Sequence, residues 1–205
     1  HNRKHSFPTR RSSDLFWKFP LSKDSLTWME SLYRQKTNRE PGRTDYYLRI
    51  PETDCLGIKI REGALEVKRR IGNHLEGSGQ PLTLEQWIKL RGDHADGEEN
   101  LPSGEWIPVT KQRWISWWAL SGEHPQPISF ANLESPTAQV ELAEVLIQGQ
   151  VYSTLGVEAA GPPNCVAELT FAVARMLQKR ESPLDFSPEA QLSYPALLQK
   201  WFSER

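Results

Sequence analysis

The chain has 205 residues, of which 38% are hydrophobic and 25% are charged, and its net charge at pH 7 is −1. This length suits one domain with a sizeable core, and a second full domain is not expected. The near-neutral charge argues against a nucleic-acid or membrane partner, so any anion site must be a local cluster. Two cysteines without CxxC spacing and the lack of a long apolar run predict a cytoplasmic protein. No pattern indicates an oligomeric state.

The first fifteen residues are expected to have no fold of their own. Residues 7–15 resemble the conceptual translation of a short-read sequencing adaptor, which would make residues 1–15 non-native. The alternative is a basic, disordered N-terminal arm. Both interpretations place the domain at residues 16–205, and the first leads us to expect that native residues just before Phe16 are missing.

The next residues predict a strand, a helix, a polar break and a second strand. These elements are expected, in that order, at 16–20, from Ser22 or Ser25 to about Lys36, at 37–43 and at 45–50.

The segment from Leu56 to Arg70 predicts a hairpin with Glu62-Gly63 as a two-residue turn. Directly opposed residues share a face, so this register separates apolar from charged side chains. The apolar face carries Ile58, Ile60, Leu65 and Val67, and the other carries Lys59, Arg61, Glu66, Lys68 and Arg70. A cation cut off from water is costly without a counter-charge, so the second face must adjoin solvent, a wet cavity or an anion site.

The remaining chain predicts an insertion, further strands and two helices. Within residues 72–104, Thr83 and Gln86 form a capping-box pattern that predicts a short helix. A strand at 106–120 places Lys111 and Arg113 on one face. Further strands are expected at 125–133, 137–147 and 151–158, and C-terminal helices within 164–205, the first capped by Asn164 and the last at about 189–202 on the outside of the sheet. The strands total about eight, as an eight-stranded barrel requires.

In this order of elements, the chain resembles the CYTH superfamily, the triphosphate tunnel fold. Three basic stretches carry the likeness: Lys59-Ile60-Arg61, Leu65-Glu66-Val67-Lys68 and Lys111-Gln112-Arg113. The resemblance implies an α+β fold with an eight-stranded antiparallel tunnel and flanking helices. The chain departs from the family at the first strand, where the family has a Glu-x-Glu-x-Lys pattern. If Lys18 is the lysine of this pattern, Phe16 takes the place of the second glutamate.

The resemblance also implies a site. A triphosphate carries about four negative charges, so several cations must converge on it. The candidate anion ligands are Lys59, Arg61, Lys68, Lys111, Arg113 and Lys18, and the candidate ligands for Mg²⁺ or Mn²⁺ are Glu141, Glu158 and Glu66. Glu144 is three residues from Glu141, so the two face opposite sides of a strand. No catalytic residue is assigned.

Three functions remain open at this point. The first preference is a CYTH-like protein that binds a small phosphorylated anion without catalysis. The second is a metal-dependent enzyme that hydrolyses inorganic, thiamine or nucleoside triphosphate, or cyclises ATP. The third is an antiparallel sheet used for protein contacts, whose cations are merely solvated.

Overall fold

A computed structural model describes residues 9–19, 22–24, 27, 28, 31, 38–76, 82–93, 101, 103–129, 136–179, 184–187 and 190–203. This part of the chain is mostly β. Its elements are β1 (Thr9–Phe19), β2 (Asn38–Leu48), β3 (Leu56–Arg61), β4 (Ala64–Glu76), β5 (Leu82–Asp93), β6 (Trp106–Ser121), β7 (His124–Ile128), β8 (Thr137–Ile147), β9 (Gln150–Ala160), α2 (Pro163–Lys179) and α3 (Tyr194–Ser203). Residues 23, 24, 27, 28 and 31 are helical, within the first predicted helix; the rest of that helix lies outside the described residues.

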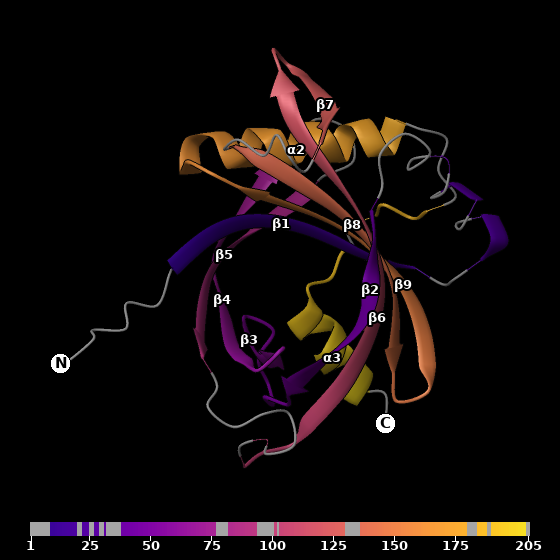
Figure 1. Ribbon diagram of the computed structural model, residues 1–205. Coiled ribbons are helices and arrows are strands. Elements are labelled where there is room, and N and C mark those ends of the chain that lie inside the picture. The colour runs from indigo at the N-terminus through magenta and orange to yellow at the C-terminus, as the bar shows by residue number, and fades with distance from the viewer. Residues whose placement is uncertain are drawn as a thin grey trace.

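The strands form one antiparallel sheet in the order β2-β3-β4-β5-β1-β9-β8-β6-β7, and β2 also pairs with β6. The sheet is strongly curled, with α2 across its outer side and α3 within the curl (Figure 1). Register shifts between Glu40 and Arg43 in β2 and between Arg70 and Gly72 in β4 mark bulges. Bulges bend a strand and increase its twist, which favours this curvature.

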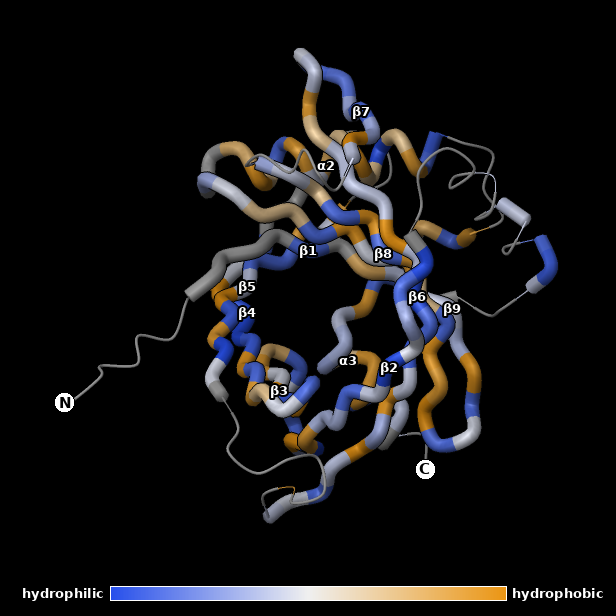
Figure 2. Tube along the Cα trace, in the orientation of Figure 1, coloured by the Kyte–Doolittle hydropathy of each residue, from blue (hydrophilic) through white to orange (hydrophobic). Residues whose placement is uncertain are grey.

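The hairpin of β3 and β4 has the predicted register. Ile58 pairs with Val67, Lys59 with Glu66 and Ile60 with Leu65. The turn residues Glu62 and Gly63 both have positive φ, 49° and 70°, as a two-residue hairpin turn requires. The β8–β9 hairpin likewise turns at Gln148-Gly149, with φ of 44° and 84°. Hydropathy alternates along β3, and both strands carry apolar and hydrophilic residues (Figure 2), because adjacent side chains face opposite sides of the sheet.

The expectation that residues 1–15 have no fold of their own is wrong for the described residues 9–15. They form the first part of β1, which pairs with β5 on one side and β9 on the other. Pairing with a strand on each side satisfies the backbone groups of this polar segment, which no local sequence signal indicates. Residues 1–8 lie outside the described part of the chain.

Two predictions between residues 37 and 93 are also wrong. The stretch 37–43 was expected to be a break, but β2 begins at Asn38 and runs through it, with the bulge at Gly42. The expected short helix within the 72–104 insertion is strand β5, which lies between β4 and β1. Leu82 and Leu84 are buried at strand spacing, so pairing on both edges overrides the local capping signal.

A hydrophobic core lies between the outer face of the sheet and α2. From α2 it takes Val166, Leu169, Val173 and Leu177, which recur at helical spacing as predicted. Its sheet residues include Leu84, Val140, Leu155 and Val157. These side chains alternate along their strands with those on the inner face, so this core fixes which face is turned inward.

The last helix differs from its prediction in both extent and position. It begins at Tyr194, because residues 190–192 are extended and bond to β1 through Lys18 N to Ala190 O and Leu192 N to Phe16 O. It packs on the inner face, where Leu197, Leu198 and Trp201 meet Tyr47, Val109 and Val145. The expected packing on the outside of the sheet is therefore wrong. The strand predicted at 125–133 ends at Ile128 as β7, and residues 130–135 lie outside the described part.

Candidate anion site within the curled sheet

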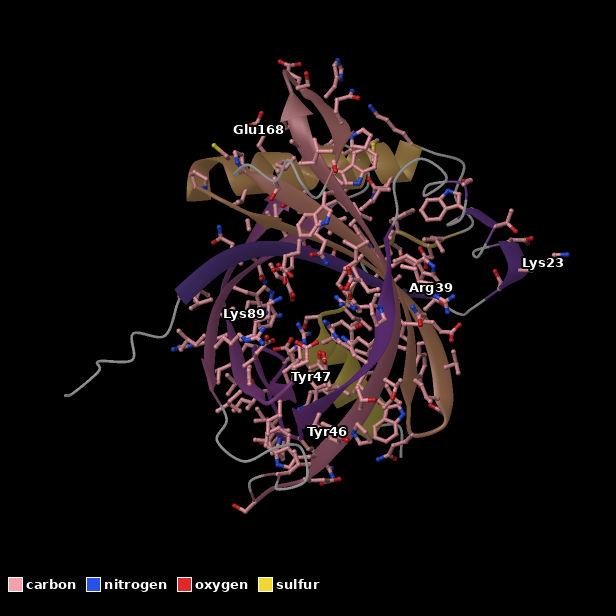
Figure 3. All side chains as sticks on the ribbon, viewed as in Figure 1. Lys23, Arg39, Tyr46, Tyr47, Lys89 and Glu168 are labelled. Atoms are coloured by element: carbon pink, nitrogen blue, oxygen red, sulfur yellow. The ribbon has the colours of Figure 1, made fainter. Side chains whose placement is uncertain are left out.

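A cavity of about 280 Å³ lies within the curl, and its lining includes five of the six predicted anion ligands. These are Lys59, Arg61, Lys68, Lys111 and Arg113. Figure 3 shows the labelled Tyr47 and Lys89, which also line the cavity, on the enclosed side of the sheet, and Glu168 on the outer side with α2. These five cations therefore lie on the enclosed side of the curled sheet and not on its outer face.

Asp45 is a buried counter-charge that three cations share. Its side chain is fully buried, and its carboxylate oxygens lie 3.2 Å from Arg43 Nε, 3.1 Å from Lys59 Nζ and 2.8 Å from Arg61 Nη2. Burial alone would raise the pKa of Asp45, but Lys59 and Arg61 hold it far below its usual range. Asp45 therefore stays ionised, and it holds three cations of β2 and β3 in place.

Glu66 is the second buried counter-charge. Its oxygens lie 3.4 Å from Lys59 Nζ, 3.3 Å from Lys89 Nζ and 3.2 Å from Arg91 Nη1. Burial would raise its pKa, but Lys59, Arg61 and Lys89 lower it to about 2. Lys59 is crowded in turn: burial, followed by the charge of Arg61, lowers the pKa of Lys59 to about 8.

Lys111 has a different environment from the other cations. Its side chain is buried, and its Nζ donates a hydrogen bond of 3.3 Å to Tyr47 Oη. The Nζ also lies 3.3 Å from the centre of the Tyr194 ring. No carboxylate among the described residues lies within 4 Å of it, and burial, then the charge of Lys59, lowers its pKa well below the ordinary value.

The start of α3 forms one wall of the cavity. Ser193 Oγ accepts a hydrogen bond of 3.3 Å from Ala196 N, as a helix cap does, and Ser193, Tyr194 and Pro195 all line the cavity. Gly57 permits this approach, since a Cβ there would lie only 3.1 Å from Pro195 Cγ. The Tyr194 ring stacks on Tyr47 with a centroid separation of 5.9 Å. The first residues of α3 therefore enclose one side of the cavity that holds the cations.

An acidic row faces the cations from the neighbouring strands. Asp14 of β1 pairs in register with Glu85 of β5 and with Glu158 of β9, and all three line the cavity. The ammonium of Lys68 contacts the Asp14 carboxylate. Burial lowers the pKa of Lys68, but Asp14 and Glu158 outweigh it and raise the pKa above its ordinary value.

The residues present do not fit the divalent metal that the resemblance implies. No group of three His, Cys, Asp or Glu side chains in the described part of the chain is arranged to hold a metal ion. Of the predicted ligands, Glu66 lies among cations, Glu141 accepts a hydrogen bond of 3.1 Å from Arg113, and Glu158 lies in the row that surrounds Lys68. The structure brings these three carboxylates to one cavity but not to one coordination sphere.

Lys18 is the predicted anion ligand that the structure places elsewhere. It is not among the residues that line the cavity, and its Nζ lies 4.2 Å from the centre of the Tyr152 ring. Phe16 lies between the cavity and Lys18 along β1 and packs on Tyr194 at a centroid distance of 4.6 Å. The strand thus carries Lys18 past the cavity. Glu144, in contrast, was predicted to face away, and it is not part of the lining.

Sequence reasoning missed several residues of the site. Besides Asp45, these are Arg43, Lys89, Glu85, Tyr47 and Tyr194. Asp45 and Tyr47 lie two apart in a predicted strand, so their common face could be read from the sequence, but its inward direction could not. Lys89 and Glu85 were missed because β5 was expected to be a helix.

Comparisons with known proteins give likenesses of structure only. No family model matches the chain, and no curated protein matches it. A conserved hypothetical protein from Pyrococcus furiosus is similar in structure, with a TM-score of 0.49 and 15% identity over 90% of this chain and 98% of that one. The PH1012 protein from Pyrococcus horikoshii OT3 has a TM-score of 0.43 and 17% identity over 82% and 92% of the two chains. None of the described helices is long and apolar enough to cross a membrane.

Proposed function

We propose that the curled sheet is an eight-stranded tunnel of the CYTH type that binds a small phosphorylated anion of the triphosphate class among its inward-facing cations. The observation that carries this proposal is the convergence of Lys59, Arg61, Lys68, Lys111 and Arg113 on one cavity. β2 is the first strand in the sheet order, and it pairs with β6, the last but one, as well as with β3. This additional pairing supports the tunnel, because it joins the two ends of the sheet order.

An unused hydrogen-bond donor also supports an anion ligand. The buried Nε of Arg113 has no hydrogen-bond acceptor among the described residues. A buried N–H without an acceptor costs about 1–3 kcal/mol, which a phosphate oxygen at that position would recover. Guanidinium groups suit such contacts, because their planar donors match the oxygens of a phosphate.

The charge balance limits the affinity we expect. Seven cationic and five acidic side chains line the cavity in the described part of the chain, and the buried Asp45 adds a sixth acid behind them. An anion must therefore compete with Asp45 and Glu66 for the same cations. The cavity of about 280 Å³ is at the small end for ligand sites, so it favours a compact anion.

We propose binding in preference to metal-dependent hydrolysis, because the carboxylates are committed to cations. The position that the resemblance assigns to a metal-binding glutamate is Phe16, and the ammonium of Lys68 contacts Asp14 two residues before it. The ammonium of Lys68 therefore supplies a positive charge at the position where the resemblance would place a metal ion.

Isothermal titration calorimetry with tripolyphosphate tests this function. We expect one anion per chain for the wild type, weaker binding by R113A and unchanged binding by R49A. Arg49 is an exposed arginine paired with Glu105 and lies outside the cavity, so it is a matched control. No binding by the wild type, or equal losses in both variants, would overturn the proposal. Release of phosphate from tripolyphosphate on addition of Mg²⁺ or Mn²⁺ would overturn its non-catalytic part.

A further inference from the structure

Lys111 is a cation for which the described part of the chain provides no ion pair. The two acids whose charges act on Lys111 are already committed: Asp45 holds Arg43, Lys59 and Arg61, and Glu141 accepts a hydrogen bond from Arg113. The groups that face Lys111 are Arg43, Asp45 and Tyr47 of β2, Lys59 and Arg61 of β3, Arg113 of its own strand β6, Glu141 of β8 and Tyr194 of α3.

The aromatic rings offset only part of the cost of a charge at this position. The Nζ lies 3.3 Å from the centre of the Tyr194 ring and 5.5 Å from that of Tyr47, so an ammonium would have cation–π contacts. Its side chain is only 2% exposed, however, and Lys59 and Arg61 repel it. A buried ammonium among other cations is disfavoured until an anion joins it.

We propose that entry of a polyphosphate is coupled to protonation of Lys111, so that the amine becomes an ammonium ion paired with the incoming anion. The proton comes from solvent and adds to the Nζ lone pair, and no covalent bond is made or broken in the ligand. The acids around the cavity almost balance its cations, so the cavity has little net positive charge to offset a polyanion. Protonation of Lys111 adds one positive charge. This inference rests on the proposed function, since it names how the same site adjusts its charge.

The coupling predicts a pH dependence of a definite sign. The pKa of Lys111 is low in the free protein and rises when an anion is bound, so binding takes up a proton between these two values. In that window, one coupled proton makes the dissociation constant rise tenfold per pH unit. Below the window Lys111 is charged in both states, and its contribution to the pH dependence disappears.

Lys59 also titrates in this range, with a pKa of about 8, so the test must isolate Lys111. Calorimetric titration with tripolyphosphate at pH 7.5–9.5, in buffers of different ionisation enthalpy, gives the number of protons taken up. Any proton that tripolyphosphate itself gains or loses on binding is common to the wild type and the variant, so the difference between the two proteins reports the lysine. We expect K111R to take up about one proton fewer than the wild type, because arginine stays charged throughout. K179R, at the exposed end of α2, should match the wild type.

The outcomes separate this inference from the proposed function. Equal proton uptake by K111R and the wild type, with binding retained, would overturn the inference alone. Absence of tripolyphosphate binding by the wild type at any pH would overturn both. A second measurement needs neither binding nor a folded variant: ¹³Cε shifts of labelled lysines in the wild type, followed against pH. A resonance from Lys111 that titrates near 10.5 in the free protein would also overturn the inference.

Discussion

Replacement of Asp45 by asparagine removes a buried counter-charge that three cations share, although Lys59 and Arg61 still contact Glu66. Asn cannot balance Arg43, Lys59 and Arg61, which lie 2.8–3.2 Å from the Asp45 oxygens. Removal of one partner from a buried ion pair typically costs about 3–5 kcal/mol, because the other charge is left uncompensated. We therefore expect D45N to lower the free energy of unfolding by about 3–5 kcal/mol, a large share of the 5–15 kcal/mol of a typical domain.

The same substitution should strengthen anion binding, because Asp45 competes with the ligand for these cations. We expect tripolyphosphate to stabilise D45N more than the wild type against urea, followed by fluorescence of the buried Trp17 and Trp87. D54N is the matched control: Asp54 is about half exposed, and its ion pair with Arg70 is worth about 0–1 kcal/mol. If D45N were as stable as D54N, Asp45 would not be the buried counter-charge described here.

Three further predictions concern the ligand, the acid stability and α3. R61A should weaken tripolyphosphate binding by about 1.5–3 kcal/mol in calorimetry, the value of a hydrogen bond to a charged group, and an unchanged affinity would remove Arg61 from the site. Glu66 has a folded-state pKa of about 2 against an ordinary 4.5, so its stabilisation, up to about 3 kcal/mol, is complete above pH 4.5 and is lost as the pH falls towards 2. Urea melts of E66Q should therefore depend less on pH than those of the wild type, and equal slopes would contradict this. L197A should lower the free energy of unfolding by about 2–5 kcal/mol, whereas the exposed L146A should change it by about 0.5 kcal/mol or less, and similar effects would place α3 outside the inner core.

The parts of the fold that the sequence predicted are those set by local pattern. The hairpin of β3 and β4 combines a two-residue turn with alternation on both strands, so a shift by one residue would reverse both faces. For β8 and β9 the sequence predicted two strands, at 137–147 and 151–158, but not their register. Helix α2 was predicted because its apolar residues recur at helical spacing.

The parts that failed depend on partners distant in the sequence. β5 carries a helix-capping pattern, but β4 and β1 pair with both of its edges. Helix α3 is amphipathic in either position, and its sequence does not say which face of the sheet it covers. Residues 9–15 lack a hydrophobic pattern and become a strand through their neighbours β5 and β9.

The candidate site was predicted in its cations but not in its counter-charges. Because side chains alternate along a strand, Lys59 and Arg61 share one face, and so do Lys111 and Arg113. The family resemblance led us to expect that these faces point into the tunnel. The partner of each cation is set by strands that pair across the curl. Asp45 therefore meets Lys59 and Arg61 through the β2–β3 pairing, which the pattern of either strand alone does not indicate.

Location of a bound phosphate analogue tests the central claim most directly. Tungstate has the tetrahedral shape and charge of an oxyanion and scatters X-rays anomalously, so its position in a crystal of the protein can be measured without bias from a fitted ligand. We expect an anomalous peak within the curl, in contact with Arg61, Lys111 and Arg113. Peaks confined to the outer surface, with the cavity free of tungstate at a saturating concentration, would contradict it.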